Sequence, residues 1–180
     1  MRILTGMNIS ESQASYTNEH VRFAMLPRYA LQPVPLILIQ PALRRIVTTI
    51  AQEKPSLFQR IGCHKDKKFL IDPYNLPFVL VLEPNPERPK LRAYNRDKVP
   101  QTQAHISGSF LTLLRMIDGE LDGDALFFTR ELSVEGDTEA VVCLRNALDN
   151  VEGSIAEDVA NIFGRAGILS LNILRRIKKN

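Results

Sequence analysis

The first half of the chain shows helical periodicity after a polar leader. Residues 21–50 are dense in Leu, Ile and Val and are interrupted by prolines. A short helix is expected to end near Pro27, because proline breaks helices. An extended link is expected at 32–35, and a turn around 55–61. Between them, a helix is predicted from apolar residues at helical spacing: Leu43, Ile46, Val47 and Ile50.

The pattern then changes to short β-rich runs separated by turn residues. These runs lie at 69–71, 78–82, 91–94 and 104–106. The connections at 72–75 and 83–86 are short enough to join antiparallel neighbours. The pattern therefore predicts a meander of about four strands.

Helical spacing returns in the second half, around one more strand. Ser107-Gly108-Ser109 offers a helix start and Gly119 a stop. Between them, Phe110, Leu113, Leu114 and Ile117 follow the i, i+3, i+4, i+7 pattern of a half-buried helix. A strand is expected at 131–134. Asp137 then caps a helix with the apolar stripe Ala140, Val141, Leu144 and Leu148.

The run 162–179 predicts a basic, amphipathic helix that is credible from about Gly167. Ile168 and Leu171 fall on its polar side. The helix could be a lid, a membrane-surface anchor or a packing face for a partner, and packing on its own domain is the plain alternative. Most of its apolar residues share an arc of roughly 140°: Ile162, Phe163, Ala166, Leu169, Ile173, Leu174 and Ile177.

Length and composition favour one folded domain with extra helices. The 180 residues are 44% apolar and 24% charged, which is ordinary globular usage. The expected organisation is a flexible leader at 1–17, an apolar helical segment at 18–62, a core at 63–150 and an amphipathic segment at 151–180. A net charge of +3 is too mild to indicate a nucleic-acid or lipid partner by itself.

The cysteines and the N-terminus indicate a cytoplasmic protein. Cys63 and Cys143 form neither a metal-binding pair nor a disulfide framework, which fits a reducing compartment. The first residues lack the apolar core of a signal peptide, and no apolar run is long enough to span a bilayer.

The sequence contains no motif that predicts metal, cofactor or catalytic chemistry. The acids of 118–124 are spaced like the start of a calcium loop, but Thr129 would occupy the twelfth position, where a bidentate carboxylate is needed. The histidines are scattered, and neither a nucleophile elbow nor a phosphate-binding glycine loop is present. Arg88, Lys90 and Arg92 alternate along a predicted strand, and without interleaved aromatics a solvated strand face is favoured over a nucleic-acid site.

Two stretches of the second half resemble the sterol-carrier-protein domain, and the likeness extends over roughly 67–149. These stretches, 106–119 and 125–139, follow that family's order of strand, leucine-rich helix, short turn with a Phe pair, strand ending in Gly, and closing helix. More narrowly, the pattern Leu-Phe-Phe-x-Arg-x-Leu-x-x-Glu-Gly-Asp-Thr-Glu at 126–139, with the proline-punctuated apolar leader, is similar to the UbiT family of ubiquinone-biosynthesis accessory factors.

The resemblance implies an α+β fold, with an about five-stranded, mainly antiparallel sheet covered by helices that enclose an apolar tunnel. It implies a non-catalytic carrier that binds a polyprenylated ubiquinone precursor, or acidic phospholipid, and supports oxygen-independent hydroxylation with the hydroxylase subunits of that pathway. Peripheral contact with the inner membrane is a further expectation. The candidate lipid-binding residues are Phe110, Leu113, Leu114, Ile117, Phe127, Phe128, Leu144 and Leu148.

Two other functions remain open. An apolar stripe at helical spacing also fits plain core packing. A scaffold or membrane-docking subunit without a lipid tunnel would therefore show the same pattern, and a packed core between the 110–117 helix and the sheet would favour it. An enzyme acting on a lipid would need polar groups facing the cavity, and the sequence indicates none.

Overall fold

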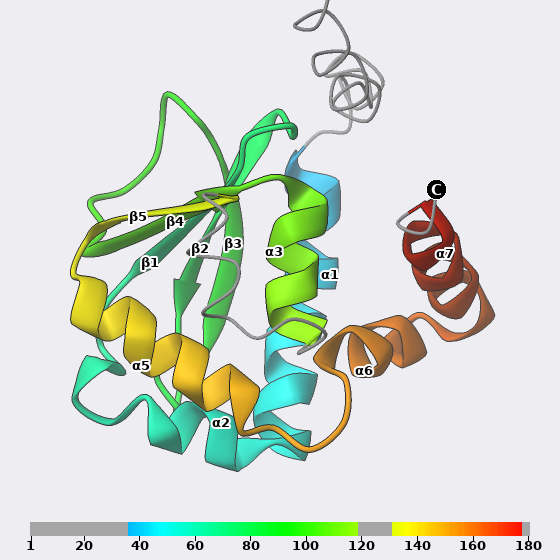
Figure 1. Cartoon of the computed structure of the whole chain (residues 1–180), viewed down its shortest axis with the longest axis horizontal. Coiled ribbons are helices and arrows are strands. Elements are labelled where there is room, and N and C mark those ends of the chain that lie inside the picture. Colours follow the sequence, from blue (N-terminus) through cyan, green and yellow to red (C-terminus); the bar gives the residue numbers. More distant parts are fainter. Residues whose placement is uncertain (1–35, 119–130, 178–180) are drawn as a thin grey trace, which may run out of the picture.

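Helices and strands follow the order that the periodicity predicts for most of the chain. The computed structural model describes residues 36–118 and 131–177 (Figure 1). The predicted helix ending near Pro27 and the stop at Gly119 lie outside these residues. The elements are α1 (Leu36–Glu53), α2 (Pro55–Arg60), η1 (Gly62–His64), β1 (Phe69–Pro73), β2 (Phe78–Glu83), β3 (Lys90–Asn95), β4 (Ala104–Gly108), α3 (Phe110–Asp118), β5 (Leu132–Gly136), α5 (Thr138–Asp149), α6 (Ile155–Ile162) and α7 (Gly164–Ile177).

The strands form one five-stranded sheet in the order β3-β2-β1-β4-β5. β1 pairs antiparallel with β2, β2 with β3, and β4 with β5, whereas β1 and β4 are parallel. The predicted fold class, a mainly antiparallel sheet with helices, is confirmed. The predicted four-strand meander is wrong, because β4 lies on the far side of β1 and not beside β3.

The outer edge of β3 explains why the meander stops after the third strand. The Gln40 side chain of α1 donates to the Ala93 carbonyl at 2.7 Å and accepts from the Ala93 amide at 3.3 Å. A fourth strand would need these same backbone groups. The chain instead returns past β2 to the free edge of β1, where the Gln103 amide bonds to the Lys68 carbonyl at 3.0 Å.

Helices cover one face of the sheet and share one core with it (Figure 1). Phe69 of β1 and Ile106 of β4 are fully buried on this face. Val47 and Ile50 from α1, Leu57 and Phe58 from α2, Leu113 and Met116 from α3, and Val141 and Leu144 from α5 pack against the same cluster. The predicted helical stripes at 43–50, 110–117 and 140–148 therefore all contribute to the core.

Local signals explain where several helices start. The Ser109 hydroxyl accepts from the Thr112 amide at 3.0 Å, and the Asp137 carboxylate accepts from the Ala140 amide at 2.9 Å, so both predicted helix starts are confirmed. The expected turn at 55–61 is instead the short helix α2, with Pro55 in its first turn. α1 continues through Pro41.

The C-terminal segment contains two helices, where one was predicted. Ser154 caps α6 by accepting from the Glu157 amide at 3.0 Å, and Gly164, with a φ of +60°, separates α6 from α7. The helical arc also places Leu171 on the polar side of the helix, and there the structure differs. Leu171 is buried against Ala156 and Ala160, because the small residues of α6 let α7 pack closely on it.

The predicted apolar arc lies largely on the outward face of α7 and does not pack on its own domain. Leu169 is 62% exposed and Ile173 is 50% exposed. Figure 1 shows α6 and α7 extending away from the sheet. No helix in 36–118 or 131–177 is long and apolar enough to cross a bilayer.

Candidate functional site

Several predicted lipid-binding residues meet in the core between the sheet and its helices. Leu113 and Leu144 are buried there, and Ile117 and Leu148 pack against the same cluster from the ends of α3 and α5. Phe69 lies opposite them on the sheet. These side chains form one continuous apolar interior.

The remaining predicted residues do not join that interior. Leu114 packs instead on the second cluster, formed by Ala156, Ala160 and Leu171. Phe110 is half-buried at the start of α3, where its amide donates to Asn75 Oδ1 at 2.8 Å. Phe127 and Phe128 lie outside the described residues.

The interior contains few polar groups. Among the described residues the buried polar side chains are His64 and Thr112, and the Thr112 hydroxyl is hydrogen-bonded to that of Ser109 at 2.7 Å. His64 Nδ1 has no hydrogen-bond partner. No cluster of metal-ligating side chains occurs in the described ranges. The described residues thus form a packed apolar core in which no acid is paired with a base.

An ion pair at the margin of the interior joins the start of α5 to the segment before β1. Lys67, just before β1, forms a short ion pair with Asp137 at the start of α5. The Lys67 hydrogen bond, followed by that of the Ala140 amide, lowers the pKa of Asp137, and the bond to Asp137 raises the pKa of Lys67. Burial raises the pKa of the Cys143 thiol on α5, which keeps this sulfur in its less reactive form.

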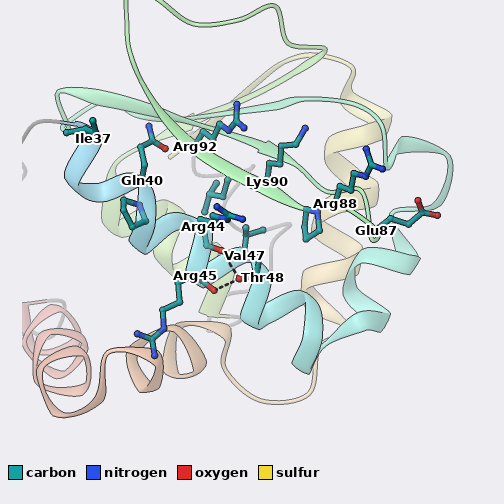
Figure 2. A pocket seen from close by; sticks show the side chains of 13 residues that line it. Ile37, Gln40, Arg44, Arg45, Val47, Thr48, Glu87, Arg88, Lys90 and Arg92 are labelled. Carbon is teal, nitrogen blue, oxygen red and sulfur yellow. Dashed lines mark hydrogen bonds between the residues drawn. The ribbon is translucent and has the colours of Figure 1, made fainter.

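A groove of about 1000 Å³ lies between α1 and β3, and none of the described lipid-binding candidates lines it. Its lining comes from α1, from β3 and from the turn before β3 (Figure 2). The lining combines apolar, polar and cationic side chains: Ile37, Gln40, Pro41, Arg44, Arg45, Val47, Thr48, Glu87, Arg88, Pro89, Lys90, Leu91 and Arg92.

Figure 2 shows how the cations of this groove are arranged. Arg88, Lys90 and Arg92 project from β3 and the turn before it, while Arg44 extends from α1 toward the strand. Arg45 points away, toward α6. The groove is therefore cationic on both its helix side and its strand side.

Sequence reasoning missed this groove. It treated Arg88, Lys90 and Arg92 as a solvated strand face and did not single out Arg44. The available signal is the pair of adjacent arginines at 44 and 45, which are the only basic residues of α1. Their significance depends on α1 lying beside β3, which periodicity does not reveal.

Comparison with known proteins supports the fold. The model of the SCP-2 sterol transfer family matches residues 49–149, more than half of the chain. The solved structure of a "UbiJ-SCP2 Ubiquinone synthesis protein" is 16% identical, covers 63% of this chain and 90% of its own, and superposes with a TM-score of 0.51. Apo sterol carrier protein 2 from Yarrowia lipolytica is 16% identical over 63% of this chain and 88% of its own, with a TM-score of 0.43. No curated protein matched. The chain belongs to the SCP-2 sterol transfer family.

Proposed function

We propose that this protein is a non-catalytic, cytoplasmic lipid-binding factor of ubiquinone biosynthesis. It binds a polyprenylated ubiquinone precursor and presents it to the hydroxylase subunits of an oxygen-independent pathway. The observation that carries the proposal is the match of residues 49–149 to the SCP-2 sterol transfer family, and α3, α5 and the sheet supply an apolar core. The UbiT-like pattern at 126–139 supports the pathway, as does the structural likeness to a protein named for ubiquinone synthesis.

An apolar interior suits a prenylated ligand because such a ligand is recognised mainly by burial. Removing about ten methylene-sized groups from water contributes roughly 8 kcal/mol before ordering costs, which is enough for micromolar binding. The ligand needs few polar contacts, and His64 and Thr112 are the buried polar side chains in the described part of the interior. The chemistry is left to the partner enzyme.

Two adjacent leucines of α3 allow a matched test of this site. Leu113 faces the interior between α3 and the sheet, whereas Leu114 faces α6 and α7. We expect Leu113→Ala to weaken binding of a fluorescent prenylphenol at least tenfold, and Leu114→Ala to leave it within about twofold. Both variants are compared as folded protein, checked by circular dichroism, because truncating a buried leucine costs about 2–5 kcal/mol of stability. Equal binding by both variants would remove Leu113 from the site.

A scaffold or membrane-docking subunit is the second candidate function. Two observations favour it: Leu113 and Met116 of α3 are packed against the sheet, and the outward face of α7 is apolar. That face carries Leu169 and Ile173 beside the exposed Arg165 and Arg176, an arrangement that suits peripheral contact with an anionic membrane. A folded protein that binds vesicles but no prenylphenol would favour this function over the carrier.

A further inference from the structure

The groove between α1 and β3 has more cationic side chains than its own acids can neutralise. Lys90 pairs with Glu83 at 3.1 Å. Within the described residues, the guanidinium groups of Arg44, Arg88 and Arg92 have no ion-pair or hydrogen-bond partner. Glu87 is the acid in the lining. Grouping like charges raises the free energy of the unliganded protein, and an anion in the groove would relieve that repulsion.

The strand edge adds backbone donors to these cations. The amide and carbonyl of Ala93 both point outward, since both bond to Gln40. In an antiparallel ladder the backbone N–H and C=O groups of residues two positions apart point to the same side of the strand. The Leu91 amide therefore also faces the groove. Guanidinium groups and an outward amide are the donors that bind phosphate oxygens in proteins.

The rest of the lining argues for an amphiphile. Val47, Pro89 and Leu91 give the groove apolar walls. Ile37 and Leu38, at the start of α1, are 74% and 66% exposed. Among the described residues no aromatic side chain lines the groove, which therefore shows no stacking platform of the kind that single-stranded nucleic-acid sites use. The Gln40 side chain already bonds to the Ala93 backbone, so an added peptide strand would have few unpaired backbone groups of β3 to bond to.

We propose that this groove binds a phosphate-bearing group and that Arg44, Arg88, Lys90 and Arg92 surround it. The shared chemistry is a phosphate ester, supplied either by the headgroup of an anionic lipid or by a soluble ester. The groove meets the apolar interior at Val47 and Leu91, and its cationic side chains lie outside that interior. The inference deepens the proposed lipid-binding function by giving the polar end of an amphiphile a place of its own.

The test uses the full chain and a matched pair of double variants. Arg44→Gln with Arg92→Gln removes two groove cations. Arg60→Gln with Lys98→Gln removes the same charge from exposed positions outside the lining. Binding is measured by flotation with vesicles of phosphatidylcholine alone and of equal parts phosphatidylcholine and phosphatidylglycerol. Glycerol 3-phosphate and a short RNA oligonucleotide are titrated separately by calorimetry.

We expect the wild type and the control to bind the anionic vesicles, and the groove variant to bind them roughly thirtyfold more weakly, at about fivefold per cation. Binding of glycerol 3-phosphate that is lost in the groove variant would support the site with a soluble ester as its source. Equal loss in both double variants would overturn the proposal, since net charge would then explain it. Wild-type binding of neither vesicles nor glycerol 3-phosphate would also overturn it, as would tight binding of RNA alone.

The same variants separate this proposal from the proposed function. Prenylphenol binding to the interior is measured alongside. Loss of anionic-vesicle binding with unchanged prenylphenol binding assigns the defect to the groove. Loss of prenylphenol binding by Leu113→Ala, with vesicle binding intact, assigns that defect to the interior.

Discussion

Arg175 of α7 donates from Nη2 to both carboxylate oxygens of Asp118 on α3, at 3.1 and 2.9 Å, across 57 residues of sequence. Its Nη1 donates to Glu157 of α6 at 2.7 Å. Ser154 joins the same group by a short hydrogen bond to Asp118. The last helix is therefore held to the domain by a bidentate guanidinium contact as well as by Leu171.

Replacing Arg175 by Met should release α7. The Asp118 side chain is only 5% exposed, so removing its cation leaves a carboxylate buried without its charge partner, at a cost of about 3 kcal/mol. We expect the α7 amides to exchange hydrogen much faster in this variant, measured by mass spectrometry. Arg176→Met, on the exposed side of α7, is the control and should change little.

Gly136 should tolerate no side chain. Gly136 ends β5, just before α5, and its φ is +78°. An added Cβ would lie 2.4 Å from the backbone oxygen of Gln103. We expect Gly136→Ala to lower the free energy of unfolding by at least about 2 kcal/mol in urea titrations.

Gly153→Ala separates the two causes of that loss. Gly153 has a similar φ of +80°, but its nearest neighbour is the Lys54 Nζ at 3.9 Å, so this variant reports the conformational cost alone. Equal destabilisation by both variants would show that the clash with Gln103 contributes nothing.

The ion pair between Lys67 and Asp137 should make stability depend on pH in a defined direction. The pKa of Asp137 is lowered from 3.8, so its contribution is present above that pH and is lost as the pH falls through the folded-state value. The pKa of Lys67 is raised from 10.5, so its contribution is lost only as the pH rises beyond 10.5. Asp137→Asn should flatten the acid limb of a stability profile measured by urea unfolding, and an unchanged acid limb would contradict this assignment.

The outward face of α7 should contribute to membrane binding independently of the groove. Leu169→Ser with Ile173→Ser removes apolar surface and leaves the charge unchanged, so vesicle binding should fall about tenfold at high salt as well as at low salt. Val142→Ser, at an exposed apolar position on α5, is the control. If the double variant binds vesicles as the wild type does, α7 faces a protein partner or solvent.

Much of the fold could be predicted because its local signals agree with its packing. The stripe at 110–117 and the caps at Ser109 and Asp137 are satisfied within a few residues of sequence, and the structure retains them. The strand order could not be read in this way. β4 pairs with β1, and the edge of β3 is contacted instead by Gln40, 53 residues away in the sequence.

The functional surfaces were harder to predict for the same reason. The helical arc through Leu169 and Ile173 identified an apolar face of α7, but its direction depends on the small residues of α6, where Leu171 packs. Arg44 and Arg92 acquire a shared role only when α1 lies along β3. Periodicity identifies which residues share a face and leaves open what that face meets.

Native mass spectrometry of the protein purified from its own host, with extraction and identification of released molecules, tests the lipid-carrier function most directly. We predict a prenylated phenol or quinone in near-stoichiometric amount, and its loss from Leu113→Ala protein purified in the same way. Protein that leaves quinone-replete cells empty, or that carries phospholipid alone, would contradict the carrier function and favour the membrane-docking subunit.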